Sequence, residues 1–160
     1  MLRIRPAQPE DAARVVEMSA GVSAAEGLGG PAVTAEMIVR LAFDERLLHV
    51  FVAEAERGLL VGHVIATRSF DVQEGTVTHW LADLFVEPAF RGRGVGRRLV
   101  GAVAERALAE GAAYVVWLVT PGNRLAERFY AGLGARRDGG VPMFLGREEM
   151  TRLAEANRPP

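Results

Sequence analysis

The spacing of hydrophobic residues changes along the chain and predicts where helices and strands lie. Residues 2–6 alternate apolar and polar side chains, which predicts a short strand with one buried face. Apolar residues at helical spacing follow at 10–19, and Thr34 is a suitable N-cap for a second helix that extends to residue 41. The apolar, β-rich runs at 47–55 and 59–70 flank a short polar turn, and this pattern predicts a β-hairpin.

The rest of the chain alternates between strand-like and helix-like patterns. A third apolar run at 77–86 stops before Pro88, and an amphipathic helix follows that carries Val95 and Leu99 on its apolar side and ends at Gly111. The remaining predicted elements are a strand at 114–119, a helix at 123–132, a final strand at 141–145 and a charged helix at 147–156. This order predicts an α/β fold in a single domain over residues 1–160, with a mixed sheet between helices and with 147–160 as a C-terminal helix and tail.

The composition is that of an ordinary soluble protein, and it excludes several chemistries. Hydrophobic residues make up 49% of the 160 residues, and the net charge of -1 at pH 7 gives no positive field to attract nucleic acid. All 19 basic residues are arginine and there is no cysteine, so lysine and cysteine nucleophiles, disulfides and thiolate metal sites are excluded. No apolar run approaches the roughly 18 residues of a membrane span, and residues 1–9 do not read as a secretory leader. We therefore expect a cytoplasmic protein without nucleic-acid or membrane partners.

A glycine-rich turn between the run at 77–86 and the following helix is the segment most typical of a binding site. Gly92, Gly94 and Gly96 alternate there, so the backbone can bend tightly and approach a ligand closely. The first amides of a helix have no intrahelical partner, and with the positive end of the helix dipole they favour phosphate oxygens. Arginine side chains add positive charge beside the turn, namely Arg91, Arg93, Arg97 and Arg98.

Other phosphate-binding motifs fit this turn poorly. A P-loop ends in Gly-Lys-Ser or Gly-Lys-Thr, and the chain contains no lysine. A dinucleotide-binding turn follows the first strand of a βαβ unit, whereas this turn follows a predicted hairpin. The simpler alternative is a tight strand-to-helix connection whose arginines are only solvated charges.

Two segments of the chain resemble the signatures of the GNAT superfamily of N-acetyltransferases. The stretch Arg91-Gly92-Arg93-Gly94-Val95-Gly96 looks like the glycine-rich signature of that family, and residues 123–135 are similar to its downstream segment N-x-x-A-x-x-F-Y-x-x-L-G. The two segments stand in the family's order, with a predicted helix and strand between them, so the resemblance covers nearly the whole chain. It implies a mostly antiparallel central sheet and acetyl-coenzyme A as the cosubstrate.

The resemblance also assigns the coenzyme to particular residues. It implies that the backbone of Phe85 and Val86 pairs with the pantetheine arm, that Asn123 helps to fix the coenzyme and that Tyr130 lies near its sulfur. It implies a pyrophosphate site on the amides of residues 92–97, which are Gly92, Arg93, Gly94, Val95, Gly96 and Arg97, with Arg91 beside them. Simpler roles stay open for two of these residues, because Asn123 also suits an N-cap and Tyr130 suits a core position beside Phe129.

Direct acetyl transfer to an amine needs a proton acceptor, a donor for the oxyanion and an acid for the leaving thiolate. Tyr130 suits the acid, because a phenol with a pKa near 10 stays protonated at neutral pH. The Val86 amide is the candidate oxyanion donor. Asp83 and His79 are candidate bases, four residues apart and on one face if the strand alternates regularly. The alternatives are an Asp83–arginine ion pair and a core role for His79.

The acceptor is expected to be the primary amine of a small molecule. Residues 81–86 resemble the corresponding strand of diamine (spermidine/spermine-type) acetyltransferases, in which Asp83 matches the second of two acids and Ala82 replaces the first. Asp83 is therefore a candidate amine-binding residue. Glu26, directly before the glycine-rich loop at 27–31, is another candidate, and the alternative for Glu26 is a solvated loop charge.

The sequence leaves two other functions open. The alternatives to a small-molecule enzyme are a protein or peptide N-acetyltransferase and a non-catalytic acyl-coenzyme A-binding module. By resemblance we expect a homodimer. No metal site is predicted, because His49 and His63 lie in separate predicted strands without ligand-like spacing.

Overall fold

The computed structural model describes residues 2–25, 32–137, 139–140, 143 and 145–156. The chain divides into two compact units, Met1–Asn123 and Arg124–Pro160. The first unit holds all the described strands and the second holds two helices. Across the described part of the chain, every helix is too short or too polar to cross a lipid bilayer.

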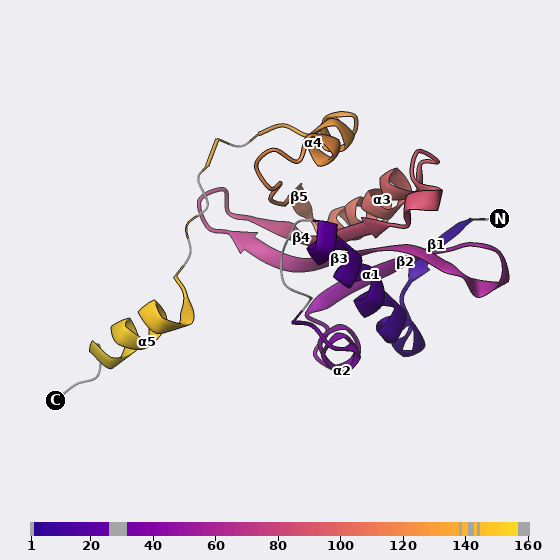
Figure 1. Ribbon diagram of the computed structural model, residues 1–160. Helices are drawn as coiled ribbons and strands as arrows, with labels where there is room; N and C mark the ends of the chain where they lie inside the picture. Colours follow the sequence, from indigo (N-terminus) through magenta and orange to yellow (C-terminus); the bar gives the residue numbers. More distant parts are fainter. Residues whose placement is uncertain (1, 26–31, 138, 141–142, 144, 157–160) are drawn as a thin grey trace. The chain divides into compact units, whose positions relative to one another are not determined.

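The first unit is built on a five-stranded sheet whose strands lie side by side in chain order (Figure 1). The strands are β1 (Arg3–Pro6), β2 (Leu48–Glu54), β3 (Leu60–Asp71), β4 (Thr76–Val86) and β5 (Ala112–Val116). Neighbours from β1 to β4 pair antiparallel, and β5 runs parallel to β4. The structure thus confirms the mixed, mostly antiparallel sheet and the predicted hairpin between β2 and β3.

Helices cover both faces of this sheet, as predicted (Figure 1). They are α1 (Ala12–Ala25) and α2 (Ala35–Val39), which continues as a π-helix (Arg40–Asp44), on one face and α3 (Val95–Ala109) on the other. Thr34 caps α2 as expected, since its hydroxyl accepts a hydrogen bond from the Met37 amide at 3.3 Å. Gly111 follows α3 with a left-handed φ of 75°, which confirms the predicted helix end.

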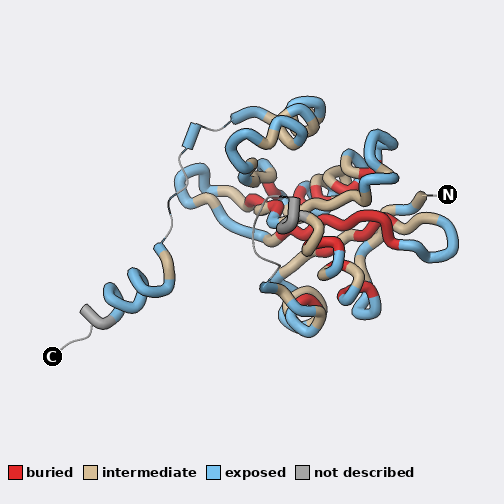
Figure 2. Tube along the Cα trace, viewed as in Figure 1, coloured by how far each residue is buried: buried red, intermediate tan, exposed pale blue. Residues whose placement is uncertain are grey.

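The hydrophobic core consists of two clusters, one on each side of the sheet. Val15 and Met18 of α1 pack with Val52 on one side, while Leu99 and Val103 of α3 pack on the other. Figure 2 shows buried stretches concentrated in the sheet and exposed stretches in the connections. Both faces of the central strands are therefore buried, which explains their nearly continuous apolar sequence.

The second unit contains the last two predicted helices. These are α4 (Arg124–Ala131) and α5 (Arg147–Ala156), close to the predicted ranges of 123–132 and 147–156.

The strand predicted at 114–119 forms earlier, at Ala112–Val116. The strand predicted at 141–145 involves residues outside the described ones, and so does Glu26.

A β-bulge in β4 changes which side chains share a face. Ile65 pairs with Asp83 and Ala66 pairs with Leu81, so Ala82 is an extra residue without a partner in β3. The extra residue reverses the alternation, so Leu81 packs in the cluster around α3 while Phe85 packs against the cluster around α1. The prediction that Asp83 and His79 lie on one face is therefore wrong, because it assumed a regular strand.

A substitution at Gly62 tests the close approach of β3 to β4. A Cβ atom at Gly62 would lie 2.7 Å from the Phe85 carbonyl oxygen, so one strand must shift. We expect Gly62→Ala to lower the free energy of unfolding by about 1–3 kcal/mol in urea denaturation. Gly101→Ala is the control, because a Cβ atom at Gly101 meets nothing within 4 Å and alanine favours the helix. Equal stability of the two variants would contradict this account.

Candidate active site

The end of β4 has one edge without a partner strand. β5 pairs with β4 only from Val77 to Trp80, while β3 pairs with β4 as far as Val86. Over the last part of β4, no other described strand pairs with the edge that faces β5. The backbone there can hydrogen-bond an extended ligand as an added strand would.

The glycine-rich turn follows β4 directly and leads into α3. Gly92 and Gly94 have φ angles of 72° and 78°, a left-handed conformation that favours glycine. Gly94 is the N-cap of α3 and provides no side-chain cap, and its carbonyl accepts the first intrahelical bond from the Arg98 amide at 3.1 Å. The amides of Val95 and Gly96 precede that bond, so they have no acceptor within the helix. The turn therefore has the backbone expected of an anion site.

Two of the arginines at this turn stack on aromatic rings. The Arg91 guanidinium lies 5.8 Å from the Phe85 ring centroid, and the Arg91 Nε atom donates to the Val86 carbonyl at 2.9 Å. The Arg93 guanidinium lies 5.4 Å from the Phe90 ring centroid. These contacts hold both positive charges beside the turn, so Arg91 in particular has a fixed partner and is not only a solvated charge.

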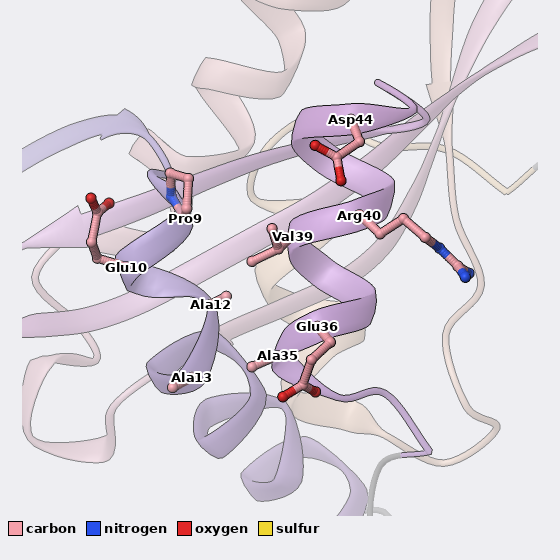
Figure 3. Close-up of a pocket in the computed structure, with 9 residues that line it drawn as sticks. All are labelled: Pro9, Glu10, Ala12, Ala13, Ala35, Glu36, Val39, Arg40 and Asp44. Carbon is pink, nitrogen blue, oxygen red and sulfur yellow. The ribbon is translucent and has the colours of Figure 1, made fainter.

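The described residues of the first unit form at least two surface hollows. One has a volume of about 470 Å³ and adjoins the glycine-rich turn at Phe90, Arg93 and Val95. The other, of about 330 Å³, lies between α1 and α2 (Figure 3). Its lining includes Ala12 and Ala35 together with three carboxylates, those of Glu10, Glu36 and Asp44. None of the predicted site residues lines this second hollow.

Asp83 lies in a small polar cluster on the α1 face of the sheet. Its Oδ2 atom accepts a hydrogen bond from the Ser19 hydroxyl at 2.6 Å and lies 2.9 Å from the His63 Nε2 atom. Ser19 and His63 are themselves 3.2 Å apart. The His63 side chain is fully buried, while that of Asp83 is 19% exposed. Asp83 therefore has a histidine and a serine as partners. The Asp83–arginine ion pair, which the sequence left open as an alternative, is not among these contacts.

The partners of Asp83 keep its carboxylate ionised. Burial on its own would raise the pKa of Asp83, but the hydrogen bonds with His63 and Ser19 outweigh it and hold the pKa below the ordinary 3.8. An ionised carboxylate that keeps some solvent access can attract an ammonium ion or accept a proton. Sequence reasoning missed Ser19 and His63 as partners of Asp83. His63 pairs with Phe85 in the β3–β4 register, which places it diagonally across from Asp83.

His79 lies on the opposite face, away from this cluster. It is fully buried, and its Nε2 atom lies 3.0 Å from the Glu110 carboxylate at the end of α3. The structure does not bring His79 and Asp83 together, so of the two interpretations of His79 it favours the core histidine. His79 is not supported as a partner of Asp83 in catalysis.

The other predicted residues lie around α4. α4 begins at Arg124, so Asn123 precedes it in the N-cap position. The backbone N–H of Asn123 donates to the Thr120 carbonyl at 3.0 Å. Tyr130 is half-buried in α4, with its ring edge-on to Phe129 at a centroid distance of 5.0 Å. Both simpler roles, the helix cap and the aromatic contact, are thus compatible with the described structure.

Comparison with known proteins identifies the family. Residues 25–135 match the family model described as "Acetyltransferase (GNAT) family". The chain belongs to the GNAT acetyltransferase family. It is therefore an acetyl-transferring enzyme, and the resemblance seen in its two sequence segments is confirmed.

Known proteins similar to this GNAT acetyltransferase differ in the acceptors that their names specify. A thialysine N-epsilon-acetyltransferase from Mus musculus is 29% identical over 143 residues, which is 84% of each chain. A solved mutant protein from Bacillus halodurans has a TM-score of 0.77 and 21% identity, covering 89% of this chain and 98% of that one. A ribosomal-protein-alanine N-acetyltransferase from Brucella melitensis has a TM-score of 0.73 and 17% identity, covering 91% and 99%. The folds of the two solved structures agree with the one described above.

The pH dependence of stability tests the Asp83 cluster. The folded pKa of Asp83 is lowered, so its stabilising contribution is present above its ordinary value of 3.8 and is lost as the pH falls through the folded value. In urea denaturation, we expect Asp83→Asn to cost about 1–3 kcal/mol at neutral pH and less as the pH falls below 3.8. Asp44→Asn is the control, because Asp44 lies at an exposed position. We expect this variant to show no such loss of unfolding free energy. If the loss of unfolding free energy in Asp83→Asn were the same at every pH, the lost interaction would not involve the charge of Asp83.

Proposed function

We propose that this GNAT acetyltransferase transfers the acetyl group of acetyl-coenzyme A to the primary amine of a small molecule by direct attack. The observation that carries the proposal is the continuous backbone surface formed by the open edge of β4, the left-handed glycines and the first amides of α3. The thialysine-acetylating relative supports a small amine as the acceptor, because its name specifies one.

The coenzyme would bind along this surface through backbone groups. The extended pantetheine arm would pair with Phe85 and Val86 at the open edge of β4, and the pyrophosphate would contact the amides of residues 92–97. The positive end of the α3 dipole and the guanidinium groups of Arg91 and Arg93 would offset the charge of the phosphates. When bound, the coenzyme supplies an activated thioester carbonyl.

Asp83 would bind the amine and accept its proton. An ammonium ion has no free lone pair, so the nitrogen must lose a proton before it attacks the thioester carbon. The Asp83 carboxylate can take that proton directly or through water, and Ser19 and His63 hold it in one orientation. The Val86 amide would stabilise the oxyanion as the new C–N bond forms. The C–S bond then breaks, the leaving thiolate takes a proton from an acid, and the second proton of the attacking nitrogen passes through water to restore that acid.

Tyr130 is the proposed acid for the leaving thiolate. This assignment rests on its place in the family segment at 123–135 and on the chemistry of a phenol, whose proton can pass to the sulfur. Asn123 is proposed as a coenzyme contact on the same basis. The homodimer expected from the resemblance stays a prediction.

An amine screen separates this function from its alternatives. The release of coenzyme A thiol from acetyl-coenzyme A should depend on an added small amine, tested with thialysine, polyamines, amino acids and aminoglycosides. Release only with peptides carrying free N-termini would assign a peptide acceptor instead. Coenzyme binding without release by any amine or peptide would indicate an acyl-coenzyme A-binding module and contradict the proposed reaction.

Substitution of Tyr130 tests the proposed acid. Tyr130→Phe removes the only proton that the ring can donate, so we expect kcat to fall by about 10²-fold or more while the affinity for acetyl-coenzyme A changes little. Tyr114→Phe provides the matched control, because Tyr114 is the other of the two tyrosines in the sequence and lies exposed on β5. An unchanged kcat for Tyr130→Phe in steady-state kinetics would remove Tyr130 as the acid.

A further inference from the structure

Three potential metal ligands from separate elements meet at the C-terminal end of α3. They are His49 of β2, His79 of β4 and Glu110, which is the C-cap residue of α3. Their ligand atoms all lie within 4.8 Å of one another. The glycine-rich turn lies at the opposite end of the same helix, so this cluster is separate from the proposed coenzyme site.

Three buried polar atoms of this cluster, namely His79 Nδ1, His79 Nε2 and Glu110 Oε2, lack hydrogen-bond partners among the described residues. The His79 Nε2 and Glu110 Oε2 atoms are 3.0 Å apart, but the geometry is not that of a hydrogen bond, and both atoms are inaccessible to solvent. His79 is fully buried, so its nitrogen atoms are shielded from bulk water. An unsatisfied buried polar atom costs about 1–3 kcal/mol, which a ligand between the two groups would offset.

We propose that His49, His79 and Glu110 bind one divalent transition-metal ion of the zinc type, with water in a fourth position. Two imidazoles and one carboxylate are ligands that zinc prefers. With zinc–nitrogen distances near 2.0–2.1 Å, two imidazole rings on one tetrahedral ion have centroids about 5 Å apart. The rings of His49 and His79 are already stacked with centroids 5.5 Å apart.

The surrounding charges leave one oxygen of Glu110 available to the ion. Arg106 Nε lies 2.5 Å from Glu110 Oε1 and His49 Nε2 lies 3.4 Å from that same oxygen. Arg106 would therefore act as an outer partner that orients the carboxylate while Oε2 binds the ion. The Arg68 Nε atom is 3.7 Å from Oε2, so this side chain, which is 60% exposed, would turn toward solvent when an ion binds.

Position in the fold supports a structural role for the ion. The C-terminal end of a helix carries partial negative charge, so the end of α3 favours a cation and offsets the two arginines. The side chains of His49 and Glu110 are 17% and 18% exposed, which gives an ion a path to the cluster. A bound ion would tie β2 and β4 to the end of α3, and so hold the sheet against the helix that begins at the glycine-rich turn.

Cobalt titration of the untagged, chelator-treated full chain tests the proposal. We expect one equivalent of Co²⁺ to bind with the visible absorption of a tetrahedral site, and Zn²⁺ to displace it. His49→Ala and Glu110→Gln should each weaken binding at least tenfold; both positions are partly exposed, which limits the risk of misfolding. His63→Gln is the matched control, because His63 is the third histidine of the chain and lies outside the cluster.

Thermal unfolding provides a second readout that does not depend on activity. Zn²⁺ should raise the Tm of the unmodified protein but not that of His49→Ala or Glu110→Gln. Mg²⁺ should not raise the Tm of any of the three proteins, because it prefers oxygen ligands. The absence of saturable Co²⁺ and Zn²⁺ binding would overturn the proposal. Binding that is unchanged in both variants would overturn it as well, since the ion would then lie elsewhere.

Discussion

β4 hydrogen-bonds to two different neighbours over two different lengths, and the architecture of the site depends on this mismatch. β3 accompanies it from Thr76 to Val86, whereas β5 leaves it after Trp80. The antiparallel partner keeps the end of β4 in the sheet, while the loss of the parallel partner opens one row of its backbone groups. Unpaired strand edges are normally a liability in folded proteins, and here the exposed row leads directly into the glycine-rich turn.

The bulge at Ala82 adds a second constraint on the same strand. Because it reverses the side-chain alternation, the polar residues of β4 divide between the two faces of the sheet. Asp83 meets Ser19 and His63 beneath α1, and His79 meets Glu110 at the end of α3. Asp83 thus has hydrogen-bond partners that offset the cost of burying its charge, whereas His79 Nε2 and Glu110 Oε2 have no hydrogen-bond partner among the described residues. The two clusters can consequently serve different purposes.

Local signals allowed the sequence to predict most of the fold and the backbone part of the site. Thr34, Pro88 and Gly111 mark element ends through their own conformational preferences, and the glycine-rich turn is specified by Gly92 and Gly94 alone. The bulge escaped prediction, because an extra residue in a strand follows from its register with another strand and not from its own sequence. The partners of Asp83 escaped for the same reason, since 20 residues separate His63 from it and 64 separate Ser19. The cluster of His49, His79 and Glu110 also has no local spacing by which sequence reasoning could find it.

Calorimetric titration tests most directly whether the open edge of β4 and the start of α3 hold a coenzyme. Acetyl-coenzyme A should be compared with the acetyl thioester of N-acetylcysteamine, which keeps the reactive group and the end of the pantetheine arm but lacks the pyrophosphate. We expect saturable binding of one acetyl-coenzyme A per chain and much weaker binding of the short thioester. Equal affinity for the two, or no detectable binding of acetyl-coenzyme A, would contradict it.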